Sequence, residues 1–184
     1  MTEEAIARRI QILQLELGAT GPSFPPIVAF GENSAVPHHS PTERKLQSAD
    51  IVLIDMGLIW KGYCSDMTRM VYQDVIPDEA RKIGELVTHI THEIIQWAKP
   101  GMKVSELDKK ARKMLGKYDK YFTHSLGHGV GIDIHEAPPV SGTSREILEP
   151  GMVITIEPGI YIAGKYGARY EEMCVVTEKG LLTL

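Results

Sequence analysis

A predicted β-hairpin with two acidic residues inside apolar strands constrains the fold of this 184-residue chain more than any other feature. Residues 51–60 and 63–72 flank Lys61-Gly62, a dipeptide that favours a tight turn. With the turn there, Asp55 faces residue 67 or 68 and lies within two residues of Asp66 across the strands. The apolar run IVLI before Asp55 argues against its exposure to solvent. The hairpin therefore predicts two carboxylates held close together in a sheet.

The arrangement is repeated near the end of the chain. A second hairpin is predicted over residues 152–177, with its turn over residues 163–167. That turn places Glu157 opposite Met173, two positions away from Glu171. Close carboxylates repel each other and cannot all stay ionised without a compensating cation. Mixed Asp, Glu and His ligands suit Mn, Fe, Co or Zn rather than Ca or a structural zinc–cysteine site.

Three of the seven histidines lie within twelve residues of the stretch 121–139, interleaved with glycines. His124, His128 and His135 are the densest group in the chain that can bind a metal or move a proton near neutral pH. The glycines weaken any helix that runs through them and let a substrate approach the backbone closely. We expect a strand or loop that presents imidazoles into a cleft.

The rest of the chain predicts helices around this sheet. An amphipathic helix is expected from Thr2 to about Leu17, and a short strand over residues 26–30. A second helix starts near Pro77, and a third covers residues 106–115 with Ser105 as its cap. These elements predict an α+β fold with two halves of similar plan, a curved and mostly antiparallel sheet with helices outside.

Composition excludes several classes of function. The net charge of −4 gives no basic footprint for nucleic acid or for a membrane surface. No apolar run approaches the roughly 18 residues of a membrane span. Cys64 and Cys174 lie far apart without CxxC spacing, so we expect no disulfide framework and a reducing cytoplasm.

The motifs resemble those of a known family. The strings IDMG, GYCSDMTR, THSLGHGVGIDIHEAP, TIEPGIY and ARYEEMCVVTEKG are similar to those of the pita-bread metallopeptidases (M24-type). The nearest branch contains the Xaa-Pro aminopeptidases and prolidases. The resemblance runs from about residue 31 to residue 180 and implies the pita-bread fold, with two pseudo-symmetric halves. Residues 1–184 are expected to form a single catalytic domain that lacks the first helix and the N-terminal domain usual in proline-specific relatives.

The resemblance also implies two divalent metal ions, with manganese favoured over cobalt, zinc or iron. Asp66 and Glu171 match the bridging carboxylates, Asp55 completes one metal, and His128 with Glu157 completes the other. Two cations lower the pKa of a bridging water, so that hydroxide exists near pH 7 and attacks the scissile carbonyl.

The remaining site residues receive roles from the same resemblance. Glu157 is expected to take the proton from the water and pass it to the leaving nitrogen. His135 is expected to donate to the developing oxyanion. His124 and His38 are expected to hold the substrate, and Arg169 to pair with a ligand carboxylate or with the substrate.

The expected function is that of a metal-dependent exopeptidase, a hydrolase that cleaves the Xaa-Pro bond at a peptide N-terminus or in a dipeptide. Its expected partner is a peptide with proline at the second position. Two alternatives stay open: a methionine aminopeptidase, and a pita-bread protein that binds partners without catalysis. A homodimer is expected if an exposed edge leaves apolar surface uncovered.

Overall fold

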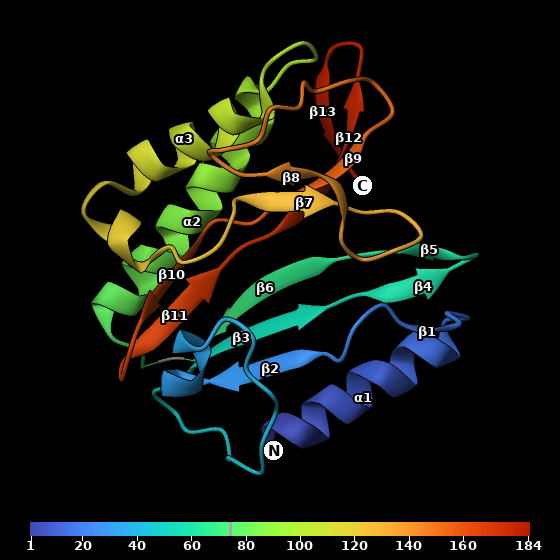
Figure 1. The fold of residues 1–184 in the computed structure, drawn as a ribbon. Helices are drawn as coiled ribbons and strands as arrows, with labels where there is room; N and C mark the ends of the chain where they lie inside the picture. Colours follow the sequence, from blue (N-terminus) through green and yellow to red (C-terminus); the bar gives the residue numbers. More distant parts are fainter. Residues whose placement is uncertain (74) are drawn as a thin grey trace.

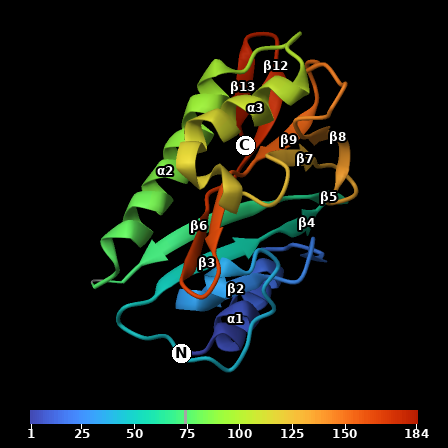
Figure 2. The ribbon, with the colours of Figure 1, turned by 60° about the vertical axis from the view of Figure 1, so that its left-hand side comes forward.

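A computed structural model describes residues 1–73 and 75–184 of the chain. Its strands form one curved layer with helices on the outside (Figure 1), and the helices lie on two separate sides of that layer (Figure 2). The helices are α1 (Glu3–Glu16), η1 (Gly31–Ala35), α2 (Asp78–Trp97), α3 (Val104–Leu115) and η2 (Gly116–Tyr121). The strands of the first half are β1 (Gly21–Pro22), β2 (Ile27–Phe30), β3 (Ile51–Met56), β4 (Leu58–Trp60), β5 (Tyr63–Cys64) and β6 (Met67–Tyr72). Those of the second half are β7 (Gly127–Gly129), β8 (Glu136–Val140), β9 (Val153–Ile156), β10 (Gly159–Ile162), β11 (Tyr166–Arg169), β12 (Glu172–Thr177) and β13 (Gly180–Thr183).

The first hairpin has the predicted register. Strands β3 and β6 pair antiparallel, with Asp55 opposite Thr68, and β4 and β5 continue the same hairpin to its turn. Lys61 and Gly62 both adopt positive φ, 52° and 87°, as a two-residue turn between antiparallel strands requires. Strand β2 pairs with β3 on its other side and completes a sheet of order β2-β3-β6.

The predicted register of the second hairpin is wrong by two residues. Gly159 pairs with Arg169 in β10–β11, and Ile156 pairs with Glu172 in β9–β12. Glu157 and Glu171 therefore stand opposite each other, between two paired segments. The turn is shorter than expected because Gly167 lies within β11, where a Cβ atom would come within 2.2 Å of the Ser34 carbonyl oxygen. The glycine serves this close approach to η1 and not the turn.

Two helices cover the second half of the sheet and enclose the main core. Buried residues recur on one face of α2 (Ile83, Val87, Ile90 and Ile94). The predicted cap at Ser105 is wrong, because α3 begins at Val104 and has no side-chain cap. The backbone before α3 is instead held by Lys103, which bridges Ile147. Helix α1 begins as predicted, since the Thr2 hydroxyl accepts from the Ala5 N–H at 3.2 Å.

The two halves meet where both hairpins carry their acids. The Glu171 N–H donates to the Thr68 carbonyl at 3.3 Å, and Arg69 also donates to the Glu171 carbonyl. The Cys64 N–H donates to the Gly131 carbonyl at 2.8 Å, which ties the first hairpin to the histidine stretch. These contacts bring four acids from distant parts of the sequence to one place.

In the described part of the chain, no helix is both long and apolar enough to cross a membrane.

Candidate metal centre

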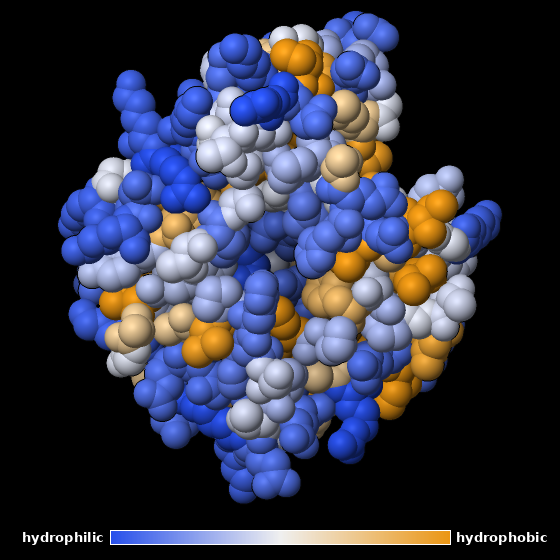
Figure 3. Space-filling view, viewed as in Figure 1, coloured by the Kyte–Doolittle hydropathy of each residue, from blue (hydrophilic) through white to orange (hydrophobic). Residues whose placement is uncertain are grey.

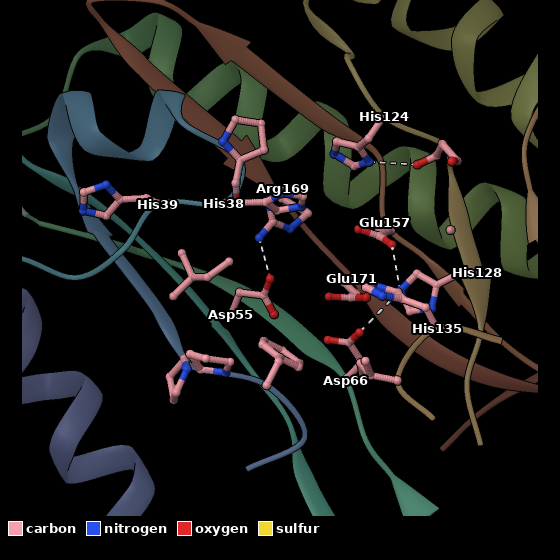
Figure 4. A pocket seen from close by; sticks show the side chains of 18 of the residues that line it. His38, His39, Asp55, Asp66, His124, His128, His135, Glu157, Arg169 and Glu171 are labelled. Carbon is pink, nitrogen blue, oxygen red and sulfur yellow. Dashed lines mark hydrogen bonds and ion pairs between the residues drawn. The ribbon is translucent and has the colours of Figure 1, made fainter. Parts of the chain in front are cut away.

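A cavity of about 530 Å³, lined by both ionisable and apolar side chains, opens between the two halves. Figure 3 shows a hollow near the middle of this face, surrounded mainly by hydrophilic residues. Side chains from both hairpins and from the histidine stretch point into it (Figure 4). All residues that the sequence analysis assigned to a site line this cavity: His38, Asp55, Asp66, His124, His128, His135, Glu157, Arg169 and Glu171.

Carboxylates and one imidazole form the centre of the cavity. Asp66, His128 and Glu171 each offer a ligand atom, and these atoms all lie within 4.8 Å of one another. His128 Nε2 lies 3.5 Å from Asp66 Oδ2 and 3.4 Å from Glu157 Oε1 (Figure 4). Asp66 is only 8% exposed and Glu171 only 1%, so solvent cannot screen their charges.

The orientation of His128 suits a metal ligand. Its Nδ1 lies 3.0 Å from the Gly129 carbonyl, and because a carbonyl only accepts, Nδ1 carries the proton. In the neutral ring, Nε2 then turns its lone pair towards Asp66 and Glu157. Burial lowers the pKa of His128, but these two carboxylates outweigh burial and the pKa is raised. A proton or a cation at Nε2 therefore stabilises the arrangement.

The acids themselves are poorly compensated by the protein. Burial raises the pKa of Glu157 to about 7, with Asp66 and Asp55 adding to the rise. Burial also raises the pKa of Glu171 well above its ordinary value. Among the neighbouring carboxylates, Glu157 contributes most to this rise. The pKa of Asp55 is raised by burial too, although the Arg169 guanidinium opposes the change. A divalent cation among these oxygens would relieve the repulsion.

Arg169 organises the oxygens on one side of the cavity. Its Nη2 donates to Asp55 Oδ2 at 2.6 Å, the pairing with a carboxylate that the sequence analysis predicted. Its Nε donates to the Thr68 hydroxyl at 3.0 Å, and that hydroxyl donates to Glu171 Oε2 at 2.7 Å. Asp55 Oδ1 is buried and, among the described residues, has no hydrogen-bond partner. That oxygen keeps a lone pair free for a cation.

The family model of Metallopeptidase family M24 matches residues 1–178 of the chain. The chain belongs to this family. An Xaa-Pro dipeptidase from Pyrococcus furiosus is 41% identical over 180 residues, which cover 97% of this chain and 52% of that protein. The M24 chain thus spans about half the length of the curated relatives it matches.

Solved structures confirm the pita-bread fold class that the resemblance implied. The prolidase from Pyrococcus furiosus matches with a TM-score of 0.97 at 39% identity, covering 100% of this chain and 55% of that one. An X-Pro aminopeptidase from Thermotoga maritima matches with a TM-score of 0.95 at 36% identity, covering 100% of this chain and 53% of that one.

In this M24 chain, His124 is engaged by the protein on both ring nitrogens. Nδ1 lies 2.8 Å from the Ser125 carbonyl and carries the proton, so Nε2 accepts from the Tyr161 hydroxyl at 2.8 Å. That hydroxyl in turn accepts from Arg169 Nη1 at 2.7 Å. Burial lowers the pKa of His124 to about 4, so the ring is neutral near pH 7. Contact between His124 and a substrate stays a prediction.

The other predicted histidines differ in their freedom. His135 and His38 are exposed at the cavity and keep their rings available. The ring of His135 packs edge-on against His128, with the ring centroids 4.4 Å apart. His39, to which the sequence assigned no role, lies 2.9 Å from the buried carboxylate of Glu3.

The donor set of this M24 chain fits divalent cations. Asp66, His128 and Glu171 offer ligand atoms close together, Asp55 Oδ1 is buried without a hydrogen-bond partner among the described residues, and the acids repel one another. Such mixed oxygen and nitrogen ligands suit Mn, Fe, Co or Zn.

Sequence reasoning did not identify Thr68 or Tyr161 as part of the site. The signal for Tyr161 was a phenol inside an apolar strand, since a buried hydroxyl usually has a partner.

Proposed function

We propose that this M24 chain acts as a metal-dependent peptidase that hydrolyses the bond before proline, in a dipeptide or at a peptide N-terminus. The observation that carries the proposal is the convergence of Asp66, His128, Glu157 and Glu171 in one cavity. Relatives named Xaa-Pro dipeptidase and X-Pro aminopeptidase support the choice of substrate. Because the chain spans only about half the length of those relatives, we propose the peptidase activity for this chain separately from theirs.

The ligands that we propose are Asp55, Asp66, His128, Glu157 and Glu171. When bound, two divalent cations would supply Lewis acidity and lower the pKa of water to near neutrality. The free oxygen of Asp55 and the lone pair of His128 Nε2 support these two assignments. Arg169 would keep Asp55 oriented while its other oxygen binds.

Glu157 is the group that we propose for proton transfer. Its carboxylate accepts from the Thr155 hydroxyl at 3.2 Å, which fixes Oε1 beside His128. It faces Glu171 across the hairpin, so a proton on either acid relieves repulsion between them. A carboxylate held in this position at the cavity suits a group that takes a proton from water and returns it.

The exposed histidines and the apolar rim would hold the substrate. His135 stands beside His128, where it can donate to an oxyanion, and His38 projects from the opposite wall. The rim beside them is formed by apolar residues that suit a proline ring: Phe24, Pro25, Pro26, Ile27, Pro37 and Ile134.

The test is metal removal followed by a small substrate panel. Chelator should abolish hydrolysis of an Xaa-Pro dipeptide, and Mn²⁺ or Co²⁺ should restore it. Turnover of Met-Ala peptides without turnover of Xaa-Pro peptides would select a methionine aminopeptidase instead. Protein that holds both metals and hydrolyses no Xaa-Pro peptide would contradict the proposal, and purified protein that holds no metal would favour a binding protein without catalysis.

Manganese, the cytoplasm and the homodimer are further proposals. Manganese is favoured by the oxygen-rich ligand set, and metal analysis of purified protein tests it.

Cytoplasmic localisation is supported by two buried free thiols, Cys64 and Cys174. Homodimerisation is supported by an apolar groove beside α1, where Leu13 and Leu17 are exposed, and light scattering tests it.

A further inference from the structure

His38 stands on a cavity wall that has little regular structure. Residues 37–41 line the cavity, and the segment 36–50 that contains them joins η1 to β3. The backbone ties the later part of this segment to the start of α1, since the Glu4 N–H donates to the Thr42 carbonyl at 3.1 Å and Lys45 forms a β-bridge with Thr2. These ties begin at Thr42, so the residues before it, which line the cavity, depend more on side-chain contacts for their position.

One anchor is the buried carboxylate of Glu3, in the first turn of α1. Glu3 is 0% exposed, although a glutamate at this position of a helix usually faces solvent. Its Oε1 accepts from the Phe30 N–H at 2.8 Å and from the Asn33 amide at 2.9 Å. Both donors precede His38 in the chain, so this oxygen holds the start of the wall.

The second oxygen of Glu3 holds the far end. Oε2 accepts from the Thr42 N–H at 3.0 Å and from the Thr42 hydroxyl at 2.6 Å. It also lies 2.9 Å from His39 Nε2. In Figure 4 the ring of His39 lies well away from the acid cluster. One carboxylate thus binds the wall on both sides of His38.

These contacts keep Glu3 ionised despite its burial. Burial alone raises the pKa of Glu3, but hydrogen bonds from Thr42, His39, Asn33 and Phe30 outweigh it and lower the pKa to about 2. Hydrogen bonds to a charged acceptor are stronger than those between neutral groups. The anchor is therefore at full strength across the range where a peptidase works.

A weaker contact ties the same wall to the metal centre. Arg169 Nη1 donates to the Pro37 carbonyl at 3.4 Å, while Nη2 binds Asp55. His38 therefore lies between Pro37, which contacts the metal-side arginine, and His39, which contacts Glu3.

We propose that Glu3 is a positioning residue for substrate. Its carboxylate fixes the wall that presents His38 to the cavity. The proposal rests on the proposed function, because His38 matters only if a peptide binds beside it. Glu3 touches neither substrate nor metal in this scheme and acts through the position of His38.

The test compares Glu3→Gln with Glu4→Gln, which removes an exposed charge one residue away. In Glu3→Gln, amide hydrogen exchange over residues 36–42 should rise about tenfold, since the Thr42 N–H loses its charged acceptor. KM for an Xaa-Pro dipeptide should rise about tenfold while kcat changes less than about twofold. Metal content should be unchanged, and Glu4→Gln should resemble the wild type throughout.

A second pair of variants, at an exposed residue, tests the same contact with less risk that the protein misfolds. Thr42→Val removes the hydroxyl that donates at 2.6 Å, whereas Thr42→Ser keeps it, and Thr42 is exposed. Exchange and KM should rise in the valine variant and return to the wild-type values with serine.

Two results would overturn the positioning role. One is unchanged exchange and KM in both Glu3→Gln and Thr42→Val. The other is a joint loss of kcat, metal and KM, which a general structural defect produces. Wild-type protein without any Xaa-Pro turnover would instead overturn the proposed function, and the substrate role of Glu3 with it. The exchange data would then still decide whether Glu3 anchors the wall.

Discussion

Glu3 and the acid cluster are both buried, yet the protein treats their charges in opposite ways. Glu3 is surrounded by donors from four residues, and its pKa falls to about 2. Glu157 and Glu171 face each other with few donors, and burial raises both pKa values, that of Glu157 to about 7. Burial alone therefore does not decide the charge of a carboxylate. Donors supplied by the fold mark a structural role, and missing donors mark a place for a cation or a moving proton.

The largest effect that would test this difference is expected from Glu157→Gln. The amide keeps the shape of the side chain but cannot take up a proton. Turnover of an Xaa-Pro dipeptide should fall by about 100-fold or more, as expected when a general base is lost. Steady-state kinetics with metal-saturated protein measure the change.

The control for this variant is its stability. Removing one of two facing acids relieves repulsion, so thermal unfolding without metal should not occur at a lower temperature than in the wild type. Near-normal turnover in Glu157→Gln would show that the proton passes through another group.

Metal binding should stabilise the cluster and leave the surroundings of Glu3 unaffected. At a free metal concentration of about 100 times Kd, binding adds about 2.7 kcal/mol of stability. For a chain of this size, that corresponds to an upward Tm shift of roughly 5–10 °C. Calorimetry with Mn²⁺ should show the shift in the wild type and in Glu3→Gln, but a much smaller one in Glu171→Gln. Equal shifts in all three proteins would place the metal elsewhere.

Glu3 should make stability depend on pH in acid solution. Its folded pKa of about 2 lies below the ordinary value of 4.5, so its contribution is complete above pH 4.5. That contribution is lost as pH falls from 4.5 towards 2, where the folded protein also takes up the proton. Urea unfolding should therefore show a gap between the wild type and Glu3→Gln that narrows over this range. A constant gap would mean that Glu3 is not ionised in the folded protein.

The two hairpins show how far sequence could predict the site. Lys61-Gly62 determined the first register correctly, because both residues adopt the positive φ that the turn needs. The register of the second hairpin was predicted wrongly because Gly167 was assigned to the turn. Its lack of a side chain instead permits a close contact with Ser34, which no local sequence pattern reveals. All nine predicted site residues nevertheless line one cavity, because their residue types and spacing are tied to the chemistry.

Glu3 shows what sequence could not supply. A glutamate in the first turn of a helix is already explained by the helix dipole, so nothing local indicates that it is buried. Its side-chain partners lie 27 to 39 residues further along the chain. Only the folded path of β2, η1 and the segment after them brings those donors to Glu3.

The smallest effect is expected from Glu172→Gln, one residue after a proposed ligand. Glu172 Oε1 accepts from Arg69 Nη2 and from the Tyr170 hydroxyl, each at 2.8 Å, so it already has the donors that Glu171 mostly lacks. Its ion pair with Arg69 is partly open to solvent, and such pairs contribute at most about 1 kcal/mol. Glu172→Gln should therefore lower stability slightly and leave metal content and turnover unchanged, as metal analysis and kinetics can check. If Glu172→Gln lost metal while Glu171→Gln kept it, Glu172 would be the metal ligand. A carboxylate with several hydrogen-bond donors would then bind the cation in place of its neighbour with few, which contradicts the comparison drawn above.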